Sequence, residues 1–371
     1  MPDHRVWFRR LGALGACLSL AACATPRYPI APTPVPSRPS YAPPVTPAPL
    51  ATPTVGRLSD LPGWDAEDHA AAFRAFQDGC RVTRDPALYD LCHQARALGR
   101  LDEDAARAFL ETHFRPRAVA VEGVLTGYFV PEYEAREDRD PPFTAAVRPK
   151  PADLPPAGGA YADRAAIEAQ DPPPGQALAW MRPEDLFFMQ IQGSGVLDLP
   201  DGRRLKASFA ASNGAPFTPI AAPLRARGAL AAAGSSGEAI RAWLADHRGP
   251  EADAVMQLNA RYVFFTVAPD DGAEPAGTAG LPLTPGRALA VDQSLHPLGG
   301  LYWIDADAPT LNGAAPVYRR LAMALDTGGA IKGPARADLY IGRGPAAGVE
   351  AGHIRHTLRL YELTPVTEPG R

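Results

Sequence analysis

Beyond residue 119 the chain consists of short apolar runs separated by clusters of glycine, proline and aspartate. Short β-prone runs between such turn signals are typical of strands. One longer stretch at 237–247 has the amphipathic spacing of a helix. Many short strands with one helical interruption favour a mainly β fold of the barrel type. The predicted strands span 119–130, 186–192, 205–209, 262–267, 288–291, 301–304, 318–325, 337–342 and 357–363.

The region before these strands has a helical pattern instead. Asp65 is the predicted N-cap of a first short helix, whose apolar residues recur at a spacing of three up to Phe76. Asp85-Pro86 predicts the start of a second helix, because proline is tolerated at the first helical position. Asp102 is the predicted cap of a third helix that runs through Phe109. We therefore expect a few short helices ahead of the β fold.

The first 22 residues have the layout of a bacterial export signal. Arg5, Arg9 and Arg10 precede an apolar stretch that is too short to span a bilayer. The stretch ends in Leu-Ala-Ala-Cys, which resembles a lipoprotein lipobox and implies cleavage before Cys23 and acylation of that residue. Ala24 follows the cysteine and favours the outer membrane. We expect a protein lipid-anchored at the periplasmic face of the outer membrane; an ordinary secretory signal is the alternative.

A proline-rich segment follows the lipobox. Residues 26–53 contain eleven prolines and no acidic residue, so this segment cannot form a packed core. We interpret 23–56 as the acylated cysteine with a semi-rigid linker. At about 3.1 Å per residue it would hold a domain roughly 80 to 90 Å from its anchor.

Cys80 and Cys92 are the cysteines that remain after processing. Because the periplasm is oxidising, we predict that they form a disulfide that joins the first two helices. Closing such a loop stabilises a fold by roughly 3 kcal/mol. The chain has no Cys-x-x-Cys, His-Glu-x-x-His or Walker-type motif, and its eight histidines are scattered. We predict neither a metal nor another cofactor.

Charge and length restrict the function further. The net charge of −4 and the pI near 6.1 argue against nucleic acid as a partner. The mature chain exceeds what one hydrophobic core usually serves, so one large or two modest domains are expected. The segment 131–223 is rich in proline, glycine and alanine between two strand-rich blocks. We interpret it as a domain inserted between 57–130 and 224–371.

Asp326 and Asp338 are the first candidates for chemistry. Each lies beside strand-forming residues, and a glycine-rich turn separates the two. A carboxylate on a buried strand loses hydration, so it must be paired, hydrogen-bonded or protonated. A carboxylic acid that stays protonated in an apolar cleft can act as a general acid. Aspartates that simply cap turns are the alternative, because Asp and Gly both favour turns.

Four further segments carry polar side chains beside glycines. Thr126-Gly127-Tyr128 ends a predicted strand, and Asp292 precedes another turn. The run 189–195 alternates apolar and amide side chains, so we expect a strand with Gln190 and Gln192 on one face. Asn213-Gly214 is a tight-turn dipeptide, for which we expect an exposed amide. Amides, hydroxyls and aromatic rings are the groups that a sugar site uses.

Taken in order, these segments resemble the membrane-bound lytic murein transglycosylase A family. The similarity spans about 119–363, and the region 286–365 looks like that family's three-aspartate (3D) domain. The motifs that carry the resemblance are Thr-Gly-Tyr-Phe-x-Pro, Gln-Ile-Gln-Gly-Ser-Gly, Asn-Gly-x-Pro-Phe, Tyr-Val-Phe-Phe, Val-Asp-x-Ser-x-x-Pro-x-Gly and Leu-Asp-x-Gly-Gly-Ala-Ile-Lys-Gly.

The resemblance implies a double-psi β-barrel domain interrupted by a smaller β domain, with glycan bound between them. It implies a peptidoglycan lytic exotransglycosylase, a carbon–oxygen lyase that cleaves the MurNAc-β-1,4-GlcNAc bond without water and leaves a 1,6-anhydro product. One aspartate does the proton chemistry, and its motif falls on Asp338, with Asp326 and Asp292 as supporting residues. Peptidoglycan strands are the implied partner, with other cell-wall enzymes as further implied partners. The implied substrate-binding residues are Thr126, Gly127, Tyr128, Gln190, Gln192, Gly193, Ser194, Asn213 and Lys332.

Some positions depart from the family pattern. Arg336 and Ala337 stand where the family often has His and Phe, and we expect Arg336 to point away from the cleft. Arg261 and Pro216 are also unusual for their motifs. Two other functions stay open: an inverting glycoside hydrolase that pairs Asp338 with a second aspartate, and a non-catalytic, expansin-like glycan-binding protein. The Asp-Thr-Gly at 326–328 imitates an aspartic protease, but such enzymes need two of these loops.

Overall fold

The computed structural model describes residues 56–119, 121–156, 159, 161–230, 236–307 and 315–366. The predicted signal peptide, Cys23 and most of the proline-rich linker lie outside these residues. Within the described part of the chain, no helix is both long enough and apolar enough to cross a membrane.

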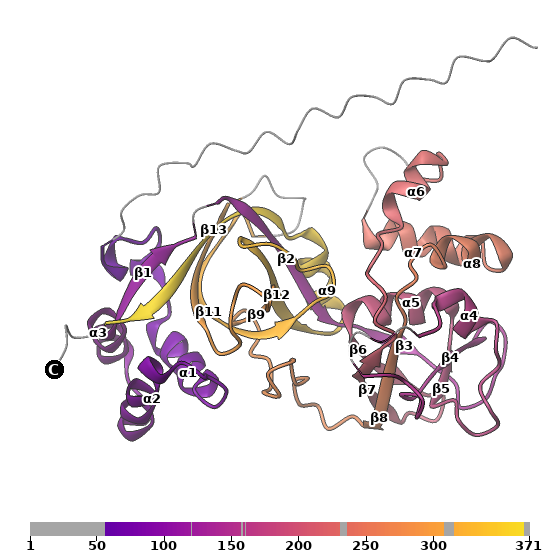
Figure 1. The fold of residues 1–371 in the computed structure, drawn as a ribbon, viewed down its shortest axis with the longest axis horizontal. Helices are drawn as coiled ribbons and strands as arrows, with labels where there is room; N and C mark the ends of the chain where they lie inside the picture. Colours follow the sequence, from indigo (N-terminus) through magenta and orange to yellow (C-terminus); the bar gives the residue numbers. More distant parts are fainter. Residues whose placement is uncertain are drawn as a thin grey trace, which may run out of the picture. The chain divides into compact units, whose positions relative to one another are not determined.

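A closed barrel of six strands forms the centre of the fold (Figure 1). The barrel order is β13-β10-β11-β9-β12-β2, and the pairing of β13 with β2 closes it. Two neighbouring pairs, β11–β9 and β12–β2, are parallel, whereas the other pairs are antiparallel. The strands are β2 (Gly123–Val130), β9 (Ala288–Val291), β10 (Leu301–Asp307), β11 (Val317–Thr327), β12 (Arg336–Arg343) and β13 (Arg355–Pro365).

The interior of the barrel is filled by alternate residues of all six strands. Leu125, Leu289 and Leu339 belong to this cluster, and all three side chains are completely buried. The residues between them on each strand therefore point to the outer face of the barrel. On part of that face, Met323 and Leu325 pack in a second cluster with the N-terminal helices. Asp338 immediately precedes the interior residue Leu339, so it lies on the outer face.

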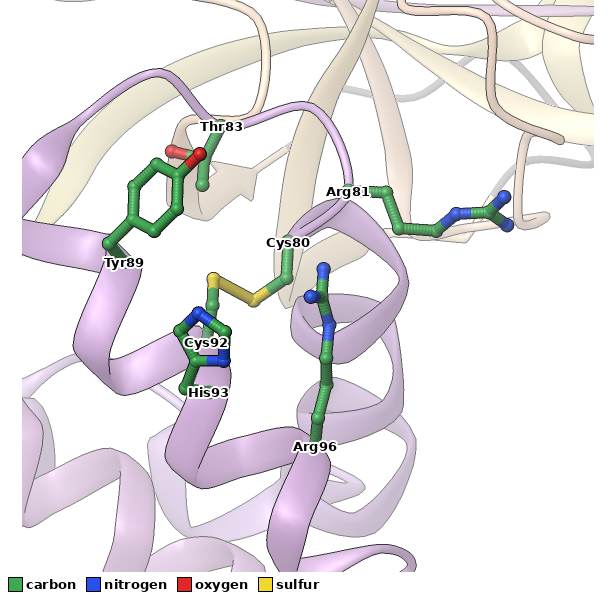
Figure 2. A pocket seen from close by; sticks show the side chains of 7 residues that line it. All are labelled: Cys80, Arg81, Thr83, Tyr89, Cys92, His93 and Arg96. Atoms are coloured by element: carbon green, nitrogen blue, oxygen red, sulfur yellow. A yellow bond between two sulfur atoms is a disulfide. The ribbon is translucent and has the colours of Figure 1, made fainter.

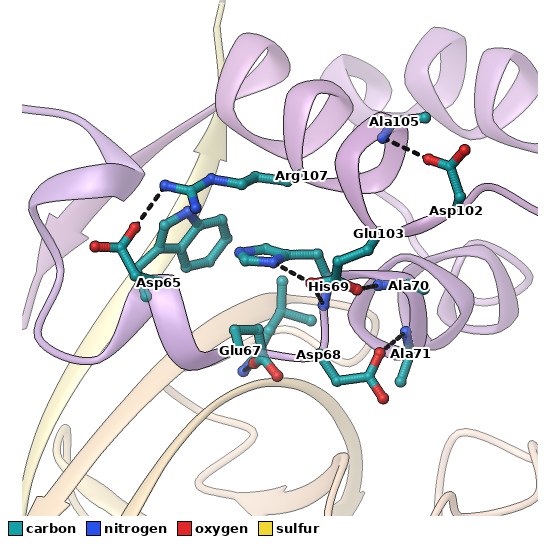
Figure 3. Close-up of polar contacts among 12 residues, drawn as sticks. Asp65, Glu67, Asp68, His69, Ala70, Ala71, Asp102, Glu103, Ala105 and Arg107 are labelled. Atoms are coloured by element: carbon teal, nitrogen blue, oxygen red, sulfur yellow. Dashed lines mark hydrogen bonds and ion pairs between the residues drawn. The ribbon is translucent and has the colours of Figure 1, made fainter.

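Three short helices cover this outer cluster: α1 (His69–Gly79), α2 (Pro86–Leu98) and α3 (Glu103–His113). Asp85 and Asp102 cap α2 and α3 as predicted. The predicted cap of α1 is wrong, because Asp68 accepts the hydrogen bond from Ala71 N at 2.8 Å. Asp65 lies instead in a short 3-10 helix, η2 (Trp64–Ala66), and pairs with Arg107, as Figure 3 shows. Another 3-10 helix, η1 (Leu58–Asp60), and the strand β1 (Phe114–Ala118), which pairs with β13, flank the helices.

The predicted disulfide between Cys80 and Cys92 is present. Cys80 follows the last residue of α1 and Cys92 lies within α2, so the bond joins the two helices of the hairpin. Figure 2 shows the disulfide among the residues that line a pocket, to which α2 contributes Tyr89, His93 and Arg96. The hairpin therefore has a covalent constraint in addition to its apolar contacts.

A second sheet of four strands has the order β3-β6-β7-β8, with β3 at Glu132–Glu134, β6 at Ser194–Asp198, β7 at Arg204–Ser212 and β8 at Val263–Pro269. The strand β8 pairs with β7 although it lies beyond residue 223, so this sheet draws on chain past the predicted end of the insert. A two-stranded sheet, β4 (Ala145–Val147) with β5 (Ala179–Met181), accompanies it. The remaining helices are α4 (Arg164–Glu168), α5 (Pro183–Gln192), α6 (Ala221–Ala226), α7 (Gly237–Asp246), α8 (Pro250–Met256) and α9 (Gly344–His353).

The predicted strand 186–192 is wrong, because this segment is part of helix α5. Proline occupies the first turn of α5, where its missing N–H costs nothing. Glu184 and Asp185 place negative charge beside the positive end of the helix dipole. Gly193 ends the helix with φ of 85°, a left-handed conformation that glycine adopts without strain. Alternation over a few residues cannot distinguish a strand from a helix that is buried on more than one side.

The other predicted strands are found with shifted ends, and 288–291 matches β9 to the residue. The predicted helix at 237–247 corresponds to α7. The mainly β character of the fold is therefore confirmed. The double-psi arrangement of the barrel and the treatment of 131–223 as a separate domain stay predictions.

Candidate active site

Thr126, Asp338, Ala290 and Asp326 form one row across four neighbouring strands. The register places Thr126 of β2 opposite Asp338 of β12, and Asp338 opposite Ala290 of β9. Ala290 is in turn opposite Asp326 of β11. Residues that face each other on adjacent strands project from the same side of a sheet. The barrel therefore brings the two predicted acids to one face, two strand spacings apart, or about 10 Å between Cα atoms.

A β-bulge is what places Asp326 in this row. Met323 belongs to the outer cluster and Ala324 to the barrel interior. Strict alternation would therefore return residue 326 to the interior. The register shifts between Ala324 and Asp326, so one additional residue is inserted and Asp326 faces outward. Bulges commonly re-aim side chains in this way.

Asp338 has the properties expected of a general acid. Thr126 Oγ1 donates a hydrogen bond to Asp338 Oδ1. Oδ2 has no hydrogen-bond partner among the described residues, and it is not completely buried. Loss of hydration raises the pKa of Asp338, and the negative charge of Asp326 acts in the same direction. The Thr126 hydrogen bond and the cation of Arg336 oppose this rise in pKa.

Asp326 is held by hydrogen bonds to both of its oxygens. Oδ1 accepts from Thr278 N at 2.9 Å, Thr278 Oγ1 at 2.8 Å and Thr327 N at 2.9 Å. Oδ2 accepts from the Tyr128 hydroxyl at 3.0 Å. Thr278 comes from a loop rich in proline and glycine, and no local sequence signal marks it. Asp326 therefore ties this loop and strand β2 to the start of the glycine-rich turn.

Asp292 is held as an ionised carboxylate on the other side of that turn. Its Oδ2 accepts from Gly333 N at 3.0 Å, and its Oδ1 accepts from Ser294 Oγ at 2.7 Å. Lys332 Nζ lies 3.4 Å from Oδ1. The hydrogen bonds from Gly333 and Ser294, with a smaller contribution from the Lys332 cation, lower the pKa of Asp292 well below its usual range. Lys332 thus points toward Asp292 with an otherwise exposed side chain.

Tyr128 lies on the same face as Thr126, two residues further along β2. Its ring is 5.3 Å from that of Tyr340 on β12, between ring centroids. Burial raises its pKa well above the usual value, and the charge of Asp326 adds to the rise. The Tyr128 hydroxyl is therefore a neutral donor to Asp326 across the row. The adjacent Gly127 has another role, because a Cβ there would lie 2.9 Å from Ala351 Cα of helix α9.

The two predicted glutamines do not share a strand face, because they belong to helix α5. Gln190 is 5% exposed, and its Nε2 donates to Val263 O at 3.1 Å. Gln192 is partly exposed, and its Oε1 accepts from Phe129 N of β2 at 3.4 Å. Gly193 caps the helix and Ser194 begins β6. Of these residues, Gln192 is the one whose side chain bonds the strand that carries Thr126 and Tyr128.

Asn213 does not expose its amide, contrary to the prediction. The side chain is 4% exposed, and Nδ2 donates to Ala162 O at 3.0 Å and to Ala260 O at 2.9 Å. Its Oδ1 accepts from Tyr262 N at 2.9 Å. Buried polar groups must be satisfied in this way, so the position needs an amide for structural reasons. The dipeptide pattern predicted a turn but could not indicate what packs over it.

The expected outward orientation of Arg336 is also wrong. Arg336 lies two residues before Asp338 on β12, and its Nη2 donates to Thr126 Oγ1 at 2.9 Å. Its Nη1 donates to Ala337 O at 2.6 Å. A permanent cation therefore stands beside the hydroxyl that bonds the candidate acid. The alternation of side chains along a strand indicates that residues 336 and 338 share a face, but it does not indicate the contact between Arg336 and Thr126.

Among the described residues, no group of three or more His, Cys, Asp or Glu side chains is arranged to hold a metal ion. Two pockets, of about 180 and 320 Å³, are lined by residues of the helical hairpin and by the ends of β10 and β13. Neither is lined by any of the three aspartates. Because the chemistry lies in the row of acids, we place the candidate site there.

Comparison with known proteins agrees with this geometry. The family profile described as "MltA specific insert domain" matches residues 124–266, and the profile described as "3D domain" matches residues 287–364. A solved membrane-bound lytic murein transglycosylase from Agrobacterium tumefaciens shares 33% sequence identity with a TM-score of 0.73, over 83% of this chain and 96% of that one. The chain belongs to the membrane-bound lytic murein transglycosylase A family.

Other members of the lytic murein transglycosylase A family agree. The Escherichia coli K12 enzyme is 34% identical over 250 residues, and this match spans 66% of each protein, slightly less than two thirds of its length. MltA from Neisseria gonorrhoeae has a TM-score of 0.69 at 26% identity, over 84% of this chain and 93% of that one. The E. coli MltA solved with bound chitohexaose has a TM-score of 0.63 at 28% identity, over 81% and 90% of the two chains.

Proposed function

We propose that this protein is a peptidoglycan lytic transglycosylase that cleaves the MurNAc-β-1,4-GlcNAc bond without water, with Asp338 as its single acid and base. The names of the relatives support the reaction class. The observation that carries the assignment is the contrast among the three aspartates. Asp338 is desolvated and its Oδ2 accepts no hydrogen bond from the part of the chain that the structure describes, whereas Asp326 and Asp292 have both oxygens engaged by the protein.

In the proposed reaction, Asp338 first donates its proton to the glycosidic oxygen O4, and the C1–O4 bond breaks. The C6 hydroxyl of the same muramic residue attacks C1, so that the C1–O6 bond forms. The proton of that hydroxyl passes to the Asp338 carboxylate and restores the acid. A raised pKa suits the first step, and the intramolecular attack removes any need for a base that activates water. One carboxyl group is therefore sufficient.

The alternative is an inverting hydrolase, which needs a second carboxylate to activate water. Asp326 is poorly suited, because three donors converge on Oδ1 and the Tyr128 hydroxyl bonds Oδ2. Asp292 is poorly suited because its lowered pKa makes it a weak base. Aspartates whose surroundings shift their pKa values in opposite directions take different roles.

We assign glycan recognition to the side chains beside the row. Tyr128 offers part of a ring face, Gln192 a partly exposed amide, and Arg336 further guanidinium donors. The chitohexaose that the E. coli relative binds is a chain of N-acetylglucosamine units, which is consistent with a glycan site.

We also propose that Cys23 is acylated and anchors the protein at the periplasmic face of the outer membrane. The relatives' description as membrane-bound supports this anchoring.

The decisive experiment digests purified sacculi in water enriched in oxygen-18 and identifies the products by mass spectrometry. We expect products with anhydro ends that are lighter than hydrolytic products by one water and contain no oxygen-18. Labelled reducing ends would establish a hydrolase, and intact sacculi would favour a binding protein.

Variants of the aspartates complete this test. Asp338→Asn should lower the rate by about 10²–10⁴-fold, the usual cost of losing a general acid and base. Asp326→Asn should retain more activity and lose more stability. Asp90→Asn, an exposed residue of α2, is the matched control that should behave as the wild type. Near-normal turnover by folded Asp338→Asn would refute the assignment.

A further inference from the structure

Arg336 directs its guanidinium at a hydroxyl rather than at an acid. Nη2 donates to Thr126 Oγ1 at 2.9 Å and Nη1 donates to Ala337 O at 2.6 Å. Among the described residues, no carboxylate oxygen forms an ion pair with it. The same hydroxyl bonds Asp338 Oδ1. Arg336, Thr126 and Asp338 therefore form a chain of hydrogen bonds that ends on the candidate acid.

The chemistry of the three groups sets the direction of this chain. A guanidinium remains protonated at all relevant pH values and can only donate. Its N–H occupies one of the two acceptor positions of Thr126 Oγ1 and accepts nothing in return. The single hydroxyl hydrogen of Thr126 is then available for Asp338 Oδ1. Oδ1 is held as an acceptor, so the exchangeable proton belongs on Oδ2, which is not completely buried.

We propose that Arg336 is a positioning residue that acts through Thr126: it orients the threonine hydroxyl toward Asp338 Oδ1 and thereby keeps the reactive proton on Oδ2, facing the glycan. This inference rests on the proposed function, in which Asp338 is the acid and base. It adds a role for Arg336 and a specific task for Thr126, which the sequence indicated only as a substrate-binding residue.

The cation also affects when the acid is protonated. The charged and titratable groups that act on Asp338 are Arg336 on β12, Tyr128 on β2 and Asp326 on β11. Tyr340 packs against Tyr128, and Arg355 of β13 stands opposite Thr126 and acts on Arg336. Burial raises the pKa of Asp338 and the charge of Asp326 adds to it, whereas the Thr126 hydrogen bond and Arg336 lower it. Removing the positive charge should therefore raise the pKa further. Activity that requires the protonated acid would then persist to higher pH.

The test measures kcat/KM against pH with soluble glycan strands, for the full chain and its variants. In Arg336→Gln the descending alkaline limb should move to higher pH, because the cation is lost. In Arg336→Lys the limb should stay near its wild-type position, because the charge remains. The rate of Arg336→Lys should nevertheless fall by on the order of 10- to 100-fold, because an ammonium group does not reproduce the geometry that orients Thr126. Arg81→Met in the helical hairpin removes a similar charge elsewhere and should leave the profile unchanged.

Thr126→Val provides a second route if Arg336→Gln fails to fold. It removes the hydroxyl but keeps the shape, so the limb should move to higher pH and the rate should fall. Carbon-13 NMR titration of the Asp338 carboxyl reports the same shift without activity. The inference would be overturned if Arg336→Gln and Thr126→Val both kept the alkaline limb and the Asp338 carboxyl titration at their wild-type pH, even if both variants were less stable. If the limbs do not move but Asp338→Asn is inactive, the role of Arg336 is refuted and the proposed function stands. If Asp338→Asn is active, the proposed function itself is refuted.

Discussion

Glu67 connects the N-terminal helices to the barrel strand that carries Asp326, and its replacement by glutamine should be costly. Its side chain is 3% exposed, and the residue lies between η2 and α1. Oε1 accepts from Arg287 Nη2 at 2.8 Å, and Oε2 accepts from Arg287 Nη1 at 2.9 Å. Oε2 also accepts from Leu321 N of β11 at 2.6 Å. Three donors therefore converge on one buried carboxylate.

Glu67→Gln keeps the shape but replaces one acceptor oxygen with an NH₂ group. In one orientation of the amide, its NH₂ group faces the N–H of Arg287 Nη2. In the other orientation, it faces both Arg287 Nη1 and Leu321 N. Arg287 also loses its counter-charge, although it keeps hydrogen bonds to Leu321 O at 3.0 Å and Asp68 O at 3.3 Å. Breaking a buried ion pair by removing one partner costs about 3–5 kcal/mol. Because Arg287 keeps these two acceptors, we expect the lower end, about 3 kcal/mol of unfolding free energy.

Equilibrium urea unfolding followed by tryptophan fluorescence is the appropriate assay. Trp64 of η2 and Trp303 of β10 lie 5.2 Å apart between ring centroids, so they report on the packing of the N-terminal segment against the barrel. The matched control is Glu238→Gln, an exposed residue in the first turn of α7, for which we expect a loss below about 1 kcal/mol. A double-mutant cycle with Arg287→Met should show strong coupling. A loss for Glu67→Gln no greater than that of the control would refute the reasoning.

Three further predictions concern the anchor, the hairpin and the recognition residues. Cys23→Ser should release the protein from the membrane fraction or leave an unprocessed precursor, and unchanged membrane association would argue against acylation. Cys80 and Cys92 should resist alkylation until reduced, and removing both should lower the melting temperature by several degrees, as a loss of ~2–3 kcal/mol implies. Asn213→Ala should lower stability rather than glycan affinity, whereas Gln192→Ala should weaken binding to glycan strands in a protein of near-normal stability. The reverse pattern would show that the site has been placed incorrectly.

Local sequence patterns determined several features of this protein directly. The caps at Asp85 and Asp102 depend on a side chain and a backbone N–H only a few residues away, so nearby residues are sufficient to predict them. The strand 288–291 is buried throughout, and its turn signals define both of its ends. The order of the motifs also indicated the family and its three aspartates. These features depend on chemistry that the neighbouring residues carry with them.

Tertiary structure alone decided how those residues meet. The bulge before Asp326 reverses the side that strict alternation would give it, and it does so through pairing with β9, a strand distant in sequence. We expected an exposed Asn213 amide and an Arg336 that points away from the cleft, because local sequence cannot show distant partners. Asn213 bonds Ala260, 47 positions away, and Arg336 bonds Thr126, 210 positions away. Helix α5 was predicted as a strand because burial on several sides removes the polar face that identifies a helix. Orientation and burial depend on non-local contacts, and these exist only in the folded chain.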